Sequence, residues 1–141
     1  MRVDWRGALQ RRPGWMNAIL LFCAYMTFVY LPFDLFWKPV AADEEVWFGW
    51  VLHGWAAKAT EPLHWAIYAA GTYGFWHMRS WLHPWAALYT AQVALGMGVW
   101  GLSDPRSPGV AAGIVPALAF SALAVGLWLS RPHFERASEG E

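Results

Sequence analysis

The chain has no surplus of charge of either sign, and charged residues are scarce altogether. Ten basic residues balance ten acidic ones, so the formal net charge is zero, and charged residues make up only 14% of the 141 positions. Binding to nucleic acid needs basic residues that neutralise phosphates. The composition therefore argues against a general nucleic-acid-binding protein, and we expect no nucleic acid among its partners.

Cysteine is nearly absent too, since Cys23 is the single example. One cysteine excludes an intrachain disulfide and a cluster of thiolate metal ligands. No zinc signature such as H-E-x-x-H occurs either. A b-type haem needs two histidines that face each other at one depth on different helices. His77 and His83 could meet this requirement only across a turn, being six residues apart, so we expect no metal and no cofactor.

Hydrophobic residues, by contrast, make up 57% of the chain, and 12 Trp, 8 Phe and 5 Tyr make it rich in tryptophan and in aromatic residues generally. A soluble domain of this length could not bury so much apolar surface. The sequence therefore predicts an integral membrane protein.

Four apolar segments with aromatic or basic flanks are suited to cross a hydrocarbon core of about 30 Å as helices. We expect an all-α, integral membrane four-helix bundle that forms a single membrane domain over residues 1–141, with a frayed polar tail over 131–141. The predicted spans are Asn17 to Trp37, Pro62 to Met78, Pro84 to Leu102 and Gly109 to Ser130.

The segment between the first two spans contains an apolar stretch, Val46 to Ala57, that is too short to cross a membrane. Trp47, Val51 and Trp55 recur at helical spacing within it, and charged residues mark its ends. This pattern predicts an amphipathic helix over about 45–58 that lies in the headgroup region. A fifth span is the alternative.

The distribution of Lys and Arg predicts the orientation, because the cytoplasmic flanks of membrane spans are enriched in these residues. Seven basic residues flank one side of the predicted bundle and three flank the other. We therefore expect both termini in the cytoplasm, which agrees with an even number of spans. The expected location is the bacterial inner membrane.

Asp34 is a charged residue inside the otherwise apolar first span, and Glu61 lies just before the second span. A carboxylate at membrane depth is costly unless it is paired or hydrated, so such residues are candidates for function. Two acids at one depth could act as a general acid and base, and Pro32 is expected to kink the helix beside Asp34. Two structural alternatives stay open: Asp34 pairs with Lys38 one turn later, and Glu61 caps the N-terminus of the second span.

Aromatic and polar side chains recur along single faces of the second and third spans. Polar groups at that depth need partners, so we expect them to point into the bundle, where Pro116 is expected to kink the fourth span and widen a cavity. Helix packing is the alternative explanation of these faces. The candidate ligand-binding residues are His64, Trp65, Tyr68, Tyr73, Trp85, Tyr89 and Gln92.

Several short motifs match the layout of a known group of membrane proteins. They are Phe33-Asp34-Leu35 late in the first span, Glu61-Pro62-Leu63-His64-Trp65 at the start of the second, Tyr89 in the third, Pro116 in the fourth and Arg131-Pro132-His133-Phe134 after it. In these features the chain resembles the EXPERA family, which includes the emopamil-binding sterol isomerases and the sigma-2 receptor. The resemblance implies binding of sterol-like or amine ligands in a cavity between helices, with Asp34 and Glu61 as the matching acids. Thr72 and its neighbours stand where family members carry a further acid, so the resemblance supports ligand binding more than isomerase activity.

Two functions stay open at this point. The first is binding of a hydrophobic small molecule, such as a sterol or another isoprenoid lipid, with isomerisation of one of its double bonds by Asp34 and Glu61 as a further step. The alternative is a non-catalytic accessory or assembly subunit of a larger membrane complex. The expected partners are accordingly the lipid-like ligand, the bilayer, and either a second copy of the chain or other membrane subunits.

Overall fold

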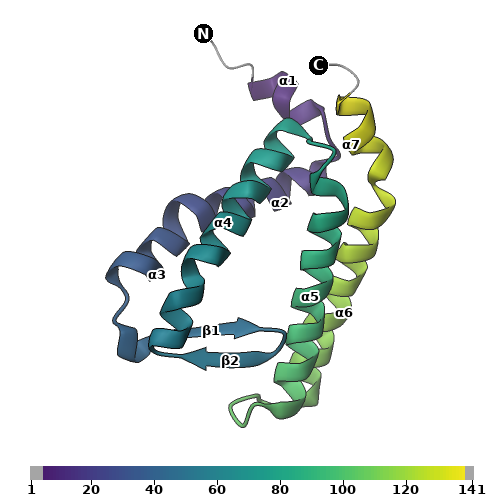
Figure 1. Ribbon diagram of the computed structural model, residues 1–141. Coiled ribbons are helices and arrows are strands. Elements are labelled where there is room, and N and C mark those ends of the chain that lie inside the picture. Colours follow the sequence, from purple (N-terminus) through teal and green to yellow (C-terminus); the bar gives the residue numbers. More distant parts are fainter. Residues whose placement is uncertain (1–4, 139–141) are drawn as a thin grey trace. The chain divides into compact units, whose positions relative to one another are not determined.

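The computed structural model describes residues 5–138, and most of them are helical (Figure 1). The chain divides into two compact units, each built from separate stretches of sequence. The first unit contains Met1–Lys38, Thr60–His83 and Ser130–Glu141, and the second contains Pro39–Ala59 and Pro84–Leu129. The single membrane domain expected over 1–141 stays a prediction.

One helix in three segments carries the first predicted span, after a short helix α1 (Trp5–Gln10). The segments are α2 (Gly14–Tyr25), a π-helical turn η1 (Met26–Tyr30) and α3 (Leu31–Trp37). Pro32 has no backbone N–H, and an irregular turn beside a proline is a usual way for a helix to accommodate it. A π-helical turn therefore directly precedes the segment with Pro32, and the kink predicted beside Asp34 stays a prediction.

Helix α4 (Trp55–His77) contains the second predicted span but begins seven residues earlier than expected. Within the first unit it lies close to α2, because a Cβ atom added at Gly71 would lie 3.2 Å from Cys23 Sγ. Its last carbonyls, those of Phe75 and Trp76, accept hydrogen bonds from the buried guanidinium of Arg12. An arginine thus satisfies the carbonyl groups that every helix leaves open at its C-terminus.

The polar tail is a helix, α7 (Arg131–Ser138), so the expectation of a frayed tail from residue 131 is wrong where the structure describes it. The last three residues, 139–141, lie outside the described part of the chain. Phe134 anchors the helix, since its side chain is only 1% exposed and its ring lies 6.1 Å from that of Phe75. One apolar residue is too weak a pattern for sequence periodicity to detect.

The second unit contains a β-hairpin where an amphipathic helix was predicted. After a 3-10 turn η2 (Val40–Ala42), strand β1 (Glu44–Trp47) pairs antiparallel with β2 (Trp50–His53), with Trp47 opposite Trp50. Phe48 and Gly49 both have positive φ, 52° and 88°, as a two-residue type I′ hairpin turn requires. The helix expected over 45–58 is therefore wrong up to His53, and only its last residues belong to α4. β-branched and aromatic residues around the glycine favour a strand pair over a helix.

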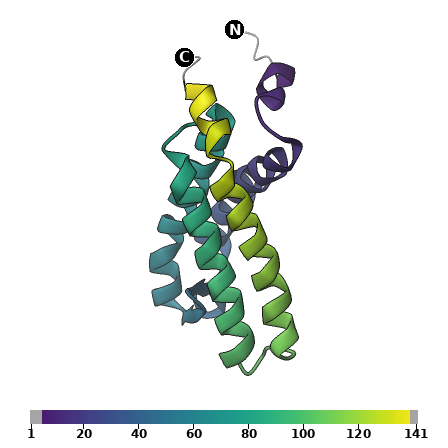
Figure 2. The ribbon, with the colours of Figure 1, turned by 90° about the vertical axis from the view of Figure 1, so that its right-hand side faces the viewer.

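Helices α5 (Leu82–Ser103) and α6 (Val110–Leu129) match the third and fourth predicted spans to within two residues at each end. They lie side by side (Figures 1 and 2), and at Gly101 and Gly113 their backbones are so close that neither position has room for a Cβ atom. The hairpin rests on α5 in the same way, since a Cβ at Gly49 would collide with Val99. Small residues allow this close helix contact.

Two helices among the described residues are long and apolar enough to cross a membrane. They are Gly14–Trp37, with mean hydropathy 1.8, and α6, with mean hydropathy 2.2. Only 11% of the most apolar 18-residue stretch of α6 is buried, so most of that helix needs an apolar environment or a partner. This favours a membrane-associated protein; the complete four-helix membrane bundle and its orientation stay predictions.

Candidate functional site

Asp34 is a buried acid on α3 that forms an ion pair one helical turn later. Lys38 Nζ lies 2.9 Å from Asp34 Oδ1, and the side chains of the two residues are 23% and 4% exposed. The i,i+4 pairing left open by the sequence is confirmed. Asp34 nevertheless does not reach solvent, because the whole residue is 3% exposed. The lysine therefore balances the charge of a buried carboxylate.

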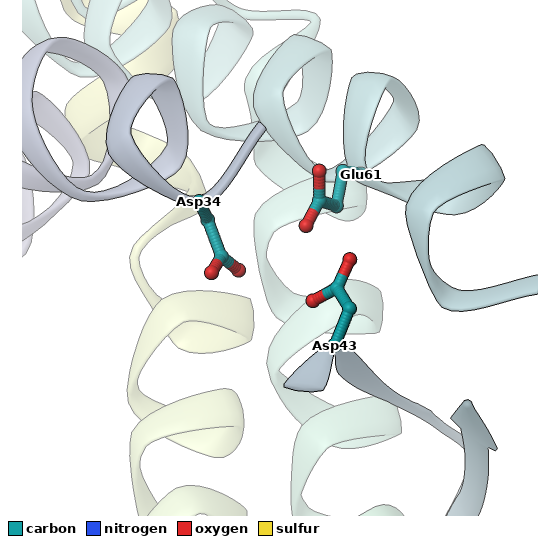
Figure 3. A group of neighbouring side chains, drawn as sticks. All are labelled: Asp34, Asp43 and Glu61. Atoms are coloured by element: carbon teal, nitrogen blue, oxygen red, sulfur yellow. The ribbon is translucent and has the colours of Figure 1, made fainter. Parts of the chain in front are cut away.

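Glu61 lies on α4, in the same unit, and is 1% exposed. One carboxylate oxygen of Glu61 is within 4.8 Å of one of Asp34, and Figure 3 shows the two side chains on their separate helices. The predicted proximity of the two acids is confirmed. Their catalytic role stays a prediction. The alternative in which Glu61 caps a helix N-terminus is wrong, because α4 begins at Trp55 and Glu61 lies in its second turn.

The structure gives Trp65 a structural partner. Its indole Nε1–H donates to the backbone carbonyl of Thr27 in η1, with an N···O distance of 2.8 Å. Its ring makes an edge contact with Phe36, with ring centroids 6.5 Å apart. Trp65 therefore links α4 to the helix that carries Asp34.

Two threonines form a second link between the same helices. The hydroxyl oxygens of Thr27 and Thr72 lie 3.1 Å apart, and each hydroxyl is also within hydrogen-bond distance of a carbonyl of its own helix. By its spacing in the sequence, Thr72 shares a helix face with Trp65, Tyr68 and Trp76. Its partner Thr27 could not be found from spacing, because the two residues are 45 positions apart.

The remaining candidate residues of α4 lie in the first unit at different exposures. Tyr68 is half-buried, and its ring lies between those of Phe22 and His64, at 5.8 Å and 6.4 Å. Tyr73 is 49% exposed and accepts a hydrogen bond from Arg79, so the expectation that it points into the bundle is wrong. It lies one turn from the end of α4, where a tyrosine can keep its hydroxyl outside the apolar layer.

The other three candidates belong to α5 in the second unit. Trp85 is 65% exposed, whereas Tyr89 and Gln92 are half-buried. Their predicted place beside the two acids stays a prediction. The second unit has an open apolar groove of about 600 Å³ between α5 and α6, whose lining includes Ala94, Leu95, Gly98, Leu102, Ser121 and Val125.

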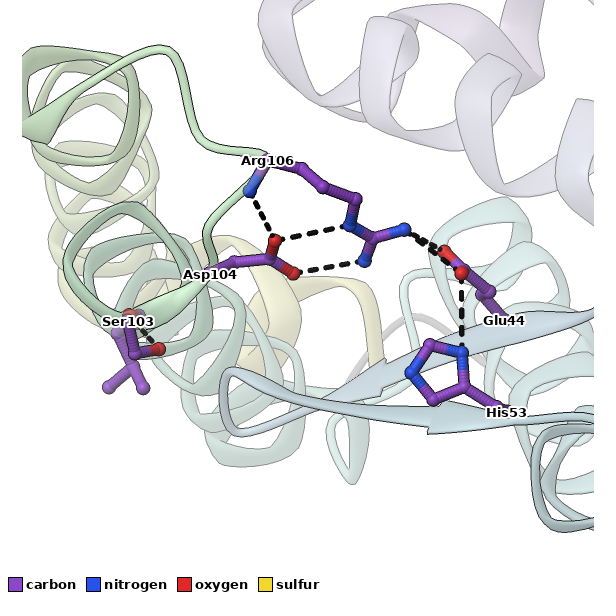
Figure 4. Close-up of polar contacts among 6 residues, drawn as sticks. Glu44, His53, Ser103, Asp104 and Arg106 are labelled. Atoms are coloured by element: carbon purple, nitrogen blue, oxygen red, sulfur yellow. Dashed lines mark hydrogen bonds and ion pairs between the residues drawn. The ribbon is translucent and has the colours of Figure 1, made fainter.

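The second unit also contains an exposed ionic network that the sequence did not predict (Figure 4). Arg106 donates to both oxygens of Glu44 at 2.9 and 2.7 Å, and its Nη2 donates to Asp104 at 2.9 Å. The hydrogen bonds from Arg106 lower the pKa of Asp104 to about 2 and also lower the pKa of Glu44. His53 Nδ1 lies 3.2 Å from Glu44 on the neighbouring strand. The network ties the hairpin to the loop between α5 and α6.

A further ion pair lies inside the second unit. Asp43 is 1% exposed, and its Oδ2 lies 3.5 Å from Lys58 Nζ, while its backbone carbonyl accepts from the N–H of Gly54. The sequence predicted Lys58 only as a charged residue at the end of an amphipathic helix. Asp43 and Lys58 stand on either side of the hairpin, so the strand pairing brings them together.

The chemistry available to the first unit follows from its buried charges. Asp34 and Glu61 are oxygen donors of the type that hard divalent cations bind, but the ammonium group of Lys38 already neutralises Asp34. Repulsion between two neighbouring carboxylates is relieved when a proton or a cationic group lies between them. The pair is therefore suited to proton transfer or to binding of an organic cation.

Comparison with protein-family models, with curated proteins and with solved structures finds no match to the chain. The function is therefore argued from the geometry of the site.

Proposed function

We propose that the chain is an integral membrane protein that binds a hydrophobic small molecule of the sterol or isoprenoid type, with Asp34 and Glu61 at the polar end of the binding site. The observation that carries the proposal is the buried pair of acids within 4.8 Å of each other on neighbouring helices. Such a pair is costly in an apolar protein and is more often kept for function than for stability. The resemblance to the EXPERA family supports the same class of ligand.

The two acids have different surroundings, which suits them to different roles. The ion pair with Lys38 suits Asp34 to accept a proton, and Glu61 would then donate one. Glu61 would add its proton to one carbon of a double bond and leave a carbocation on the other. Asp34 would remove a proton from the next carbon, and the electrons of that C–H bond would form the shifted double bond. One proton enters and one leaves, so the step is an isomerisation without oxidation or reduction.

Binding of a cationic probe tests the role of the acids. The purified protein in lipid nanodiscs is titrated with a fluorescent sterol that carries a tertiary amine, and with its uncharged hydroxyl analogue. Asp34→Asn and Glu61→Gln should each weaken binding of the amine about tenfold or more, because a charge-assisted hydrogen bond contributes roughly 1.5–3 kcal/mol. Binding of the uncharged analogue should change little.

Glu135→Gln is the matched control, since Glu135 is an exposed acid paired with Arg131 on α7. It changes the net charge by the same amount and should leave both affinities unchanged. Equal amine affinity in Asp34→Asn and the unchanged protein would refute the role of the acids. For the isomerase step, a sterol with a ring double bond is incubated in heavy water. We expect one deuterium atom in each product molecule, and no incorporation of deuterium by Asp34→Asn or Glu61→Gln.

A second function is favoured by a different observation. The apolar surface of α6 is largely uncovered, with Val115, Leu118 and Leu129 each more than 60% exposed. A helix of this kind suits an accessory subunit of a membrane complex as well as a lipid-facing span. Purification in mild detergent distinguishes the two, because a stable protein partner favours the subunit and a monomer or dimer with bound lipid favours the ligand-binding protein.

A further inference from the structure

The π-helical turn η1 and Pro32 remove the usual backbone donors from the carbonyl of Thr27. In an α-helix the carbonyl of Thr27 would accept from the N–H of Leu31, but that N–H donates to Met26. In a π-helix the donor would come from residue 32, which is Pro32 and has no N–H. The turn and the proline together therefore leave the carbonyl of Thr27 without a hydrogen-bond donor from residue 31 or 32.

Trp65 supplies the missing donor from α4, at an N···O distance of 2.8 Å. Inside a bilayer no water could replace it, and a backbone carbonyl without a partner is costly there. Trp65 lies one turn after Glu61 on α4, and its ring contacts Phe36, two residues beyond Asp34. Its two contacts therefore hold the helix on both sides of Asp34.

We infer that Trp65 is a positioning residue, which sets the place of Asp34 relative to Glu61 by occupying the carbonyl of Thr27. It acts through the helix backbone and not by contact with a ligand, so this role replaces the ligand-binding role that the sequence suggested. The inference rests on the proposed function, because it assigns the geometry of the same pair of acids. The hydrogen bond from Trp65 to the carbonyl of Thr27, and its dependence on Pro32, can be tested without any ligand.

A double-mutant cycle tests the inference. Trp65→Phe keeps a ring but removes the N–H donor, and Pro32→Ala supplies a backbone N–H that allows an ordinary α-helical turn to form. Trp65→Phe alone should weaken amine-sterol binding at least about fivefold and shift the pH midpoint at which the infrared carboxyl bands of the pair titrate. In the Pro32→Ala background the same substitution should have little effect, because the carbonyl of Thr27 then has a donor from its own helix.

The infrared bands are assigned by their loss in Asp34→Asn and Glu61→Gln and are measured without ligand. Trp55→Phe, at a 77% exposed tryptophan of the same helix, is the matched control and should change neither readout. If Trp65→Phe lowers thermal stability but leaves the carboxyl bands and the affinity unchanged, Trp65 is merely structural and the inference is wrong. Equal effects in both backgrounds would overturn it as well.

The inference about Trp65 can be tested even if the protein does not bind the amine sterol or if Trp65→Phe does not fold. If the unchanged protein does not bind the amine sterol, the proposed function fails, while the infrared titration still decides the role of Trp65. If Trp65→Phe does not fold, the indole Nε1–H resonance of Trp65 is compared between the unchanged protein and Pro32→Ala. The inference expects this proton to lose its hydrogen bond in Pro32→Ala, and an unchanged resonance contradicts it.

Discussion

The contact between α5 and α6 gives a prediction whose sign can be worked out from two competing effects. Replacing glycine by alanine inside a helix normally stabilises it by roughly 0.5–1 kcal/mol, because glycine loses more backbone freedom on folding. At Gly113 this gain meets an obstacle. A Cβ atom there would lie 2.6 Å from the carbonyl oxygen of Met97 and 2.9 Å from the backbone nitrogen of Gly101, both on α5.

The obstructing atoms decide the balance, because they belong to the backbone and no side chain can rotate away. Overpacking of this kind costs about 1–3 kcal/mol, so Gly113→Ala should be less stable than the unchanged protein by up to about 2 kcal/mol. Gly98→Ala is the matched control, since a Cβ there would meet only Ala117 Cβ, at an ordinary 3.8 Å. It should be neutral or slightly stabilising.

Thermal unfolding followed by circular dichroism in detergent micelles measures the difference. At roughly 4 °C per kcal/mol for a chain of this size, the midpoint of Gly113→Ala should fall several degrees below that of Gly98→Ala. Equal midpoints would show that α5 and α6 can separate without cost. The close backbone approach would then contribute nothing to the stability of the second unit.

Two further substitutions test the polar contacts outside the carboxylate pair. Arg12→Met should destabilise the protein by about 1–3 kcal/mol, because it removes the guanidinium donors from the carbonyls of Phe75 and Trp76, and should speed amide hydrogen exchange in the last turn of α4. Arg11→Met, at the exposed neighbour, is the control. Arg106→Gln tests the ionic network through the pH dependence of stability. The pKa of Asp104 falls from 3.8 to about 2 on folding. The network therefore stabilises the folded state above pH 3.8, and this stabilisation is lost as the pH drops to about 2. Unfolding midpoints of the unchanged protein and Arg106→Gln should therefore differ at neutral pH and converge near pH 2, and a constant difference down to pH 2 would contradict the assigned contacts.

The elements with long apolar runs could be predicted from the sequence, and those set by a few local angles could not. Helices α5 and α6 match their predicted bounds closely because apolar length and a flanking proline or glycine mark their ends. The hairpin was missed because Trp47, Val51 and Trp55 satisfy helical spacing while the turn residues Phe48 and Gly49 lack the usual Asn-Gly or Asp-Gly signal. The positive φ angles of these two residues form the hairpin turn, although the spacing of the apolar residues predicts a helix.

The candidate site shows the same contrast. Lys38 one turn after Asp34 could be predicted because i,i+4 spacing brings the two side chains together on a helix. Glu61 could be placed near Asp34 because both lie at the same end of their predicted spans. The role of Trp65 could not, because it depends on the π-helical turn, and a proline in a span predicts an irregularity without saying which carbonyl it leaves open. The bond from Arg106 to Glu44 joins residues 62 positions apart, beyond the reach of any local pattern.

Three locally unfavourable features lie together in the first predicted span, and their coincidence argues for function. The π-helical turn ends at Tyr30, Pro32 removes a backbone donor two residues later, and the buried acid Asp34 follows after two more. Each feature costs stability, and a span that only crossed a membrane would need none of them. Each is also matched by a partner: Trp65 serves the open carbonyl and Lys38 balances the acid. These unfavourable features and their partners occur together beside a second buried acid. The best explanation is that together they hold Asp34 in a defined position.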